Sequence, residues 1–90
     1  MTSAPVPHRV VVLAIPPVIG YDLTIPPQVL GEAYDEAGRP LYDVQVVSVD
    51  GAPVQASRGY AIAPSAGIEM LATAETVIVP GTMIHGPRHE

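Results

Sequence analysis

One apolar run constrains the fold of this 90-residue chain more than any other feature: VVVLAI, from Val10 to Ile15. A run with no polar residue on either face is typical of a strand buried on both sides, as in a parallel sheet between helices. Proline cannot donate to the backbone hydrogen bonds of a sheet, so Pro16 and Pro17 are expected to end this strand. TVIVPG, which ends at Gly81, predicts a further buried strand over 76–79.

Between these runs, six apolar positions spaced by threes and fours predict a helix with one apolar face: Ile25, Val29, Leu30, Ala33, Tyr34 and Ala37. Gly38 is expected to end the helix, because glycine readily takes the left-handed conformation found after helix C-termini. Its start has two alternatives. Either Thr24 caps the helix, with the prolines at 26 and 27 in its first turn, or the helix begins near Tyr21 and the prolines kink it. Asp35 and Arg39 are expected to pair one helical turn apart.

The remaining elements complete an α/β pattern. A strand is predicted over Tyr42–Val49, a tight turn at Asp50-Gly51, a hairpin around Val54 and Ile62 that turns near Arg58-Gly59, and a helical turn over 67–72. Right-handed crossovers would place strands 10–15 and 76–79 side by side and parallel, with strand 42–49 on the far side of the first. We therefore expect the first half of a doubly wound, flavodoxin-like, mostly parallel sheet with a small β-hairpin. The whole chain, 1–90, would be one partial domain, with an ordered core over 8–81 and a loose tail over 82–90.

A candidate site follows from this strand order. Ligands of doubly wound sheets bind outside the carboxyl ends of the strands, where the strand order switches. Asp22 follows the first strand and Gly81 follows the last, so we expect both at the same edge of the sheet. Each residue also has a simpler interpretation: Asp22 as the N-terminal cap of the helix, and Gly81 as an ordinary turn glycine. In both cases Asp22 would lie at the positive end of the helix dipole.

Charge and composition argue against several classes of function. The net charge is −5, from nine acidic residues and four arginines, without a lysine or a cysteine. Nucleic acids and anionic membranes bind clustered cations, so direct contact with either is not expected. No thiolate site can form, and His85 and His89 flank Pro87, which argues against a helical metal site, so we expect no metal and no cofactor. Without an export signal or an apolar run of about 18 residues, the chain is expected to be cytoplasmic.

The ordered motifs VVVLAIPPVIGYDLTIPPQVLGEAYDEAG and ETVIVPGT, with the hairpin between them, resemble the N-terminal half of ThiJ/PfpI domains in the class I glutamine amidotransferase-like superfamily. The phrases YDEAGRPLYDV and VIVPGT are most similar to the amidase-like domain at the front of AraC-type transcriptional regulators. The resemblance runs from His8 to Arg88. It implies that Asp22 takes the place of the acidic residue that points toward the nucleophile, although catalytic members commonly have Glu there. It also implies that the Gly81 backbone N–H belongs to an anion-binding site, with Thr82 where many members have a second glycine. These three residues, Asp22, Gly81 and Thr82, form the expected ligand pocket.

The resemblance also implies what this chain does not supply. The family's nucleophilic cysteine, its later histidine and the helix-turn-helix module of the regulators have no counterpart in the 90 residues. We therefore expect no enzyme activity, but a partial ligand-sensing or dimerisation domain, with a small-molecule ligand and either a homo-oligomer or a missing C-terminal half as partner. The alternative is an N-terminal fragment of a ThiJ/PfpI-type hydrolase, deglycase or amidase. A third interpretation is structural: the apolar TVIVP strand would recruit another chain along its open edge.

Overall fold

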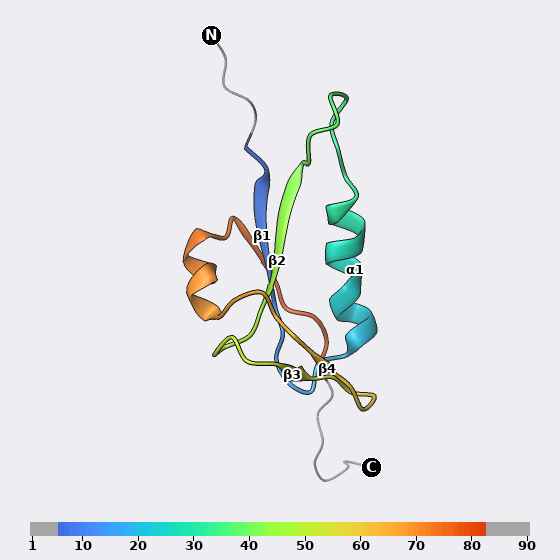
Figure 1. Cartoon of the computed structure of the whole chain (residues 1–90), viewed down its shortest axis with the longest axis vertical. Coiled ribbons are helices and arrows are strands. Elements are labelled where there is room, and N and C mark those ends of the chain that lie inside the picture. The colour runs from blue at the N-terminus through green and yellow to red at the C-terminus, as the bar shows by residue number, and fades with distance from the viewer. Residues whose placement is uncertain (1–5, 83–90) are drawn as a thin grey trace, which may run out of the picture.

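The computed structural model of the chain describes residues 6–82, which form a small α/β fold (Figure 1). Strands β1, β2 and β5 make a parallel sheet in the order β2-β1-β5, and β3 and β4 make a separate antiparallel pair. The described elements are β1 (His8–Leu13), α1 (Gly20–Gly31), β2 (Tyr42–Val47), β3 (Val54–Gln55), β4 (Ala61–Ile62), the 3-10 helix η1 (Ile68–Thr73) and β5 (Thr76–Ile78). The predicted order and parallel direction of the three sheet strands are confirmed. The prediction that strand 76–79 is buried is wrong: β5 is an edge strand, and Val77 and Val79 are 47% and 55% exposed.

The central strand β1 explains why its sequence is apolar throughout. It pairs with β2 from His8↔Tyr42 to Leu13↔Val47, and with β5 from Val10↔Thr76 to Val12↔Ile78. Because both of its edges are hydrogen-bonded and both of its faces are covered, Val10 to Val12 are at most 2% exposed. The strand ends at Leu13, two residues before the predicted end, and β2 likewise ends two residues early, at Val47.

Helix α1 begins and ends earlier than the apolar spacing predicts. Of the two predicted starts, the structure has the one near Tyr21, with Pro26 and Pro27 inside the helix. Thr24 is therefore not the cap, and its hydroxyl instead donates to the Tyr21 carbonyl at 3.0 Å. The helix is shifted toward the N-terminus, so a different set of side chains faces the sheet.

The predicted apolar face of the helix is accordingly wrong in part. Leu23 is buried and Leu30 packs against the core, whereas Ile25 and Val29 are 43% and 63% exposed. Tyr34 lies beyond the end of the helix, as does Ala37. An apolar residue at helical spacing thus does not by itself establish which side of α1 contacts the sheet.

A tight turn explains why the helix does not continue to Gly38. The Asp35 carboxylate accepts hydrogen bonds from the backbone N–H groups of Ala37 and Arg39, both at 2.9 Å, and offers the chain an alternative to helical bonding. Gly38 lies in this turn with φ +81° instead of ending α1. The expected Asp35–Arg39 ion pair forms at 2.9 Å, but across the turn and not along a helix. The N–H of Arg39 is the largest cause that lowers the pKa of Asp35 below its ordinary value.

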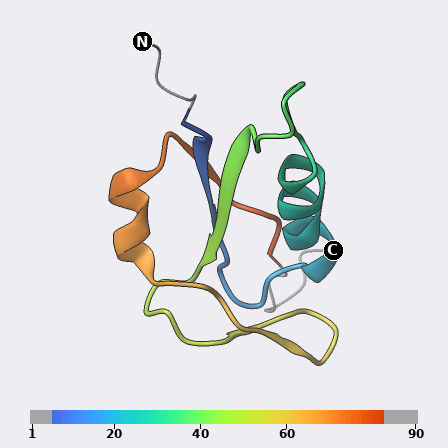
Figure 2. The same cartoon turned by 45° about the horizontal axis from the view of Figure 1, so that its top comes forward.

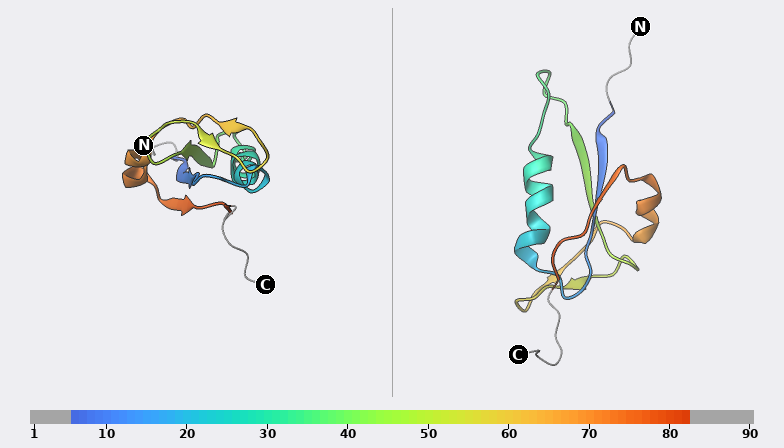
Figure 3. Two further views of the ribbon diagram at one scale, coloured as in Figure 1. Left: turned by 90° about the horizontal axis from the view of Figure 1, so that it is seen from below. Right: turned by 180° about the vertical axis from the view of Figure 1, so that it is seen from behind.

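Two layers flank the sheet, and the hairpin crosses one end of it. Figure 2 shows α1 and η1 on opposite sides of the strands, and Figure 3 shows the same layers from below and from behind. The β3–β4 pair lies across the end where β1 and β2 finish (Figure 1). The buried core includes residues from β1, the following loop, α1 and the hairpin: Val10, Val12, Ala14, Val18, Leu23, Val54 and Ala56. No helix within residues 6–82 is long and apolar enough to cross a membrane.

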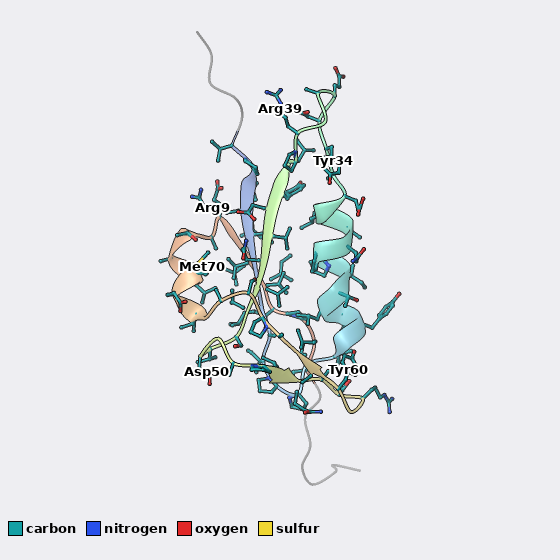
Figure 4. The ribbon with its side chains drawn as sticks, viewed as in Figure 1. Arg9, Tyr34, Arg39, Asp50, Tyr60 and Met70 are labelled. Atoms are coloured by element: carbon teal, nitrogen blue, oxygen red, sulfur yellow. The ribbon has the colours of Figure 1, made fainter. Side chains whose placement is uncertain are left out.

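A reciprocal contact holds the amino end of β5 against β1. The N–H of Glu75 donates to the Arg9 carbonyl at 2.8 Å, while the N–H of Arg9 donates to the Glu75 carboxylate at 3.0 Å. This second bond is the largest cause that lowers the pKa of Glu75 below its ordinary value. The Arg9 side chain, labelled in Figure 4, also donates from Nε to the Thr73 carbonyl at 2.6 Å. The pair therefore fixes the position at which β5 enters the sheet.

Candidate functional site

The segment between β1 and α1 is hydrogen-bonded to the hairpin on one side and to the segment after β5 on the other. On one side, the N–H of Val18 donates to the Gln55 carbonyl at 3.0 Å, and the N–H of Ser57 donates to the Val18 carbonyl at 2.8 Å. On the other side, the N–H of Ile19 donates to the Gly81 carbonyl at 2.9 Å. The hairpin and the segment after β5 thus both hold the point from which α1 starts.

Asp22 and Gly81 meet at this point. Asp22 is the third residue of α1 and is half-buried. A methyl group added to Gly81 would lie 2.6 Å from Asp22 Oδ2 and 3.1 Å from Ile19 Cδ1. The carboxylate therefore packs directly against the Gly81 backbone, at the carboxyl ends of β1 and β5. The strand order predicts that both residues lie at this edge of the sheet, and the structure shows their direct contact. The role of the two residues as a ligand pocket stays a prediction.

Gly81 is needed for this close approach and not for its backbone conformation. The glycines of the described residues with positive φ are Gly38, Gly51 and Gly59, and Gly81 is not among them. Any larger residue at position 81 would displace the Asp22 carboxylate. The glycine is thus more than an ordinary turn residue, because its missing side chain makes room for the acid.

Asp22 does not act as the N-terminal cap of α1. The cap is Ile19, which makes no side-chain capping bond, and Asp22 lies three positions further along. A carboxylate in the first turn still benefits from the positive end of the helix dipole. Among the hydrogen bonds of the described residues, none involves the Asp22 carboxylate. It can therefore accept hydrogen bonds from a ligand.

Thr82 lies next to this contact and makes a structural bond. Its hydroxyl donates to the Pro17 carbonyl at 2.8 Å, and its backbone forms an antiparallel bridge with Val18. Since the hydroxyl proton is already bonded, the Thr82 side chain can offer a ligand only an oxygen lone pair. Its main effect is to join the segment after β5 to the loop after β1.

Tyr60 is a residue at this edge that sequence reasoning missed. A methyl group added to Gly20 would overlap the Tyr60 hydroxyl, so the phenol end lies against the first residue of α1. Figure 4 labels Tyr60 in the hairpin, beside the N-terminal end of α1. Tyr60 is 47% exposed, and its hydroxyl adds a second polar group at the helix start. Its position depends on how the hairpin folds across the sheet, and no local motif marks it.

The candidate site has two polar side chains at the N-terminal end of α1. The Asp22 carboxylate and the Tyr60 hydroxyl provide polar groups at a helix N-terminus, and the sequence contains no cysteine. His85 and His89, at which we expect no metal site, lie outside the described residues. Comparison with known proteins adds no relative: no family model, no curated protein and no solved structure matches this chain.

Proposed function

We propose that this chain is the small-molecule-sensing part of an AraC-type transcription regulator, built as the first half of a doubly wound, flavodoxin-like ThiJ/PfpI domain. The contact between Asp22 and Gly81 carries the proposal. It lies between β1 and β5, where the chain crosses from one side of the first strand to the other. This is the place where open α/β sheets bind their ligands.

The proposal assigns sensing to the chain and no catalysis. Covalent catalysis in the ThiJ/PfpI family, which this chain resembles, depends on a cysteine, and this sequence has none. Asp22 would then act as a hydrogen-bond acceptor for the ligand. A bound ligand at this position touches the start of α1 and the segment after β5 together, so it can change how the two are held.

We also propose that another strand pairs with the outer edge of β5. Among residues 6–82, β5 is paired only with β1, and Val77 and Val79 are 47% and 55% exposed. Apolar edge strands readily add another strand. The remaining half of the domain would supply it, or a second copy would do so for the isolated chain. A clean, stable monomer in size-exclusion chromatography would count against this part.

The site is tested by nuclear magnetic resonance of the ¹⁵N-labelled chain during titration with a panel of amides, amino acids and amines. A ligand of the proposed site should shift the amide signals of residues 19–23 and 80–82. Asp22→Asn should weaken this response and leave the dispersion of the spectrum unchanged. Glu32→Gln is the matched control, because it removes an exposed acid just beyond the other end of α1. An equal response in Asp22→Asn and the unaltered chain would refute the site.

The regulator assignment has its own test, the reading frame that follows Glu90. Two helix-turn-helix units downstream would support the regulator. A strand-to-helix turn with a cysteine, followed by a stop, would instead support the hydrolase, deglycase or amidase. This outcome is independent of the titration, so the site and the regulator assignment can fail separately.

A further inference from the structure

A cavity of about 300 Å³ lies on the other side of β1 from the Asp22–Gly81 contact. It opens where β1 and β2 end, and its wall is formed by the loops that leave these two strands. Two of its lining residues are polar, Ser48 and Asp50, and Figure 4 labels Asp50 on the loop after β2. The others are apolar: Ala14, Pro16, Val49, Ala52, Pro53 and Val54.

Local hydrogen bonds fix the shape of this wall. The N–H of Ala52 donates to Asp50 Oδ1 at 3.0 Å, and the Ser48 hydroxyl donates to the Ala52 carbonyl at 2.8 Å. Gly51, between them, has φ +77°, a conformation that glycine adopts without strain. The N–H of Ala14 is bonded to the Val47 carbonyl at 2.9 Å, which joins the two strand ends. The cavity is therefore preformed.

Five of the eight lining residues offer no free backbone N–H. Its two prolines have no N–H, and the N–H groups of Ala14, Ser48 and Ala52 are already bonded within the protein. The Ser48 hydroxyl proton is bonded as well, so this buried residue can offer only an oxygen lone pair. Asp50, exposed at the mouth, adds a carboxylate. The polar side chains of the lining are thus acceptors, and one of them is negatively charged.

We propose that this cavity binds a small alkyl- or aralkylammonium compound. The apolar wall would hold the hydrocarbon part, and the ammonium group would donate to the Asp50 carboxylate. The size is suitable, because an apolar cavity of about 150 Å³ already binds benzene and ligand pockets start at about 300 Å³. Carboxylates and phosphates are disfavoured, since the Asp50 carboxylate would repel their negative charge. This site is separate from Asp22, so it does not depend on the proposed function.

Three probes of nearly equal size test the proposal: benzylammonium, benzyl alcohol and benzoate. Each is titrated into the ¹⁵N-labelled chain, and the amide shifts give the site and the dissociation constant. Benzylammonium should bind most tightly and benzoate most weakly, with the largest shifts at residues 14 and 48–54. Benzoate binding as tightly as benzylammonium, largest shifts elsewhere, or no binding of any probe would overturn the proposal.

Asp50→Asn tests whether the charge of Asp50 contributes to binding. Asp50→Asn should weaken benzylammonium binding about fivefold, the upper range for an exposed charge pair, and leave benzyl alcohol binding unchanged. The turn at 50–52 should survive this change, because asparagine Oδ1 can also accept the Ala52 N–H. The spectra are recorded on freshly purified protein, since an Asn-Gly pair deamidates. Glu36→Gln, which removes an equal charge in the loop before β2, should change nothing.

Ala52→Leu adds bulk to the wall and should weaken the binding of all three probes. Unchanged benzylammonium affinity in Asp50→Asn, or in a folded Ala52→Leu variant, would contradict the proposal. If Ala52→Leu does not fold, Asp50→Asn still tests the proposal, because that variant leaves the apolar wall of the cavity unchanged.

Discussion

Gly81→Ala tests the contact on which the candidate site depends. The added methyl group would lie 2.6 Å from Asp22 Oδ2, about 0.8 Å inside the 3.4 Å at which ordinary van der Waals contact begins. It would also crowd Ile19 Cδ1, at 3.1 Å. Inserting a methyl group into a packed site costs about 1–3 kcal/mol. Asp22 is half-buried and can rotate away, so we expect a loss near the lower limit, about 1 kcal/mol.

Chemical denaturation monitored by circular dichroism measures this loss. In a domain of this size, about 1 kcal/mol corresponds to a decrease in Tm of about 4–8 °C. Gly31→Ala is the matched control, because a methyl group there meets nothing within 4 Å. It should be neutral or stabilise the helix by up to about 1 kcal/mol.

A double-mutant cycle attributes the loss to the carboxylate. In an Asp22→Ala background the clash with Oδ2 is gone, so Gly81→Ala should cost less than about 0.5 kcal/mol. The coupling energy between positions 22 and 81 should then be at least about 0.5 kcal/mol. A neutral Gly81→Ala, or an equal cost in both backgrounds, would refute the contact.

Three further changes test other parts of the structure. Thr82→Val removes the hydroxyl that donates to the Pro17 carbonyl, and thermal denaturation should show a loss of about 1 kcal/mol; an unchanged Tm would contradict this bond. Gly20→Ala would overlap the Tyr60 hydroxyl and should cost about 1 kcal/mol, a loss that Tyr60→Ala should relieve; no relief would place the strain elsewhere. The hydrogen bond from the Arg39 N–H holds the pKa of Asp35 below its ordinary value, so the charged carboxylate stabilises the fold at neutral pH, and this contribution is lost as the pH falls through the folded pKa. Asp35→Asn should therefore lower stability at neutral pH and not in strong acid, and a pH-independent difference in an acid titration would contradict the assignment.

The sequence predicts the sheet better than it predicts the helix. VVVLAI is apolar because β1 is buried on both faces, and TVIVP pairs beside it although Val77 and Val79 are 47% and 55% exposed. Short connections then leave few arrangements of the strands. The helix boundaries are harder to predict, because side-chain hydrogen bonds to the backbone compete with helical hydrogen bonds. Asp35 binds the backbone of its own turn, and the chain accepts Pro26 within the helix, so apolar spacing alone places α1 several residues late.

The candidate site is also predictable from the sequence only in part. Asp22 and Gly81 follow strand ends, and strand order predicts that they lie at the same edge of the sheet, whereas their direct contact is seen only in the structure. The bond from Thr82 to Pro17 and the approach of Tyr60 to Gly20 depend on how loops fold over the sheet edge. Contacts of that kind join residues far apart in sequence without a repeating pattern, so only the folded chain reveals them.

The parallel pairing of β1 with β5 is the claim from which the position of Asp22 follows, and nuclear Overhauser contacts in the ¹⁵N-labelled chain test it most directly. The structure predicts contacts between register partners Val11 and Val77, and between the Ile19 amide and Gly81, in the pattern of parallel strands. Close Hα–Hα contacts between β1 and β5 indicate antiparallel strands. Their presence, with no contact between Ile19 and Gly81, would contradict the account.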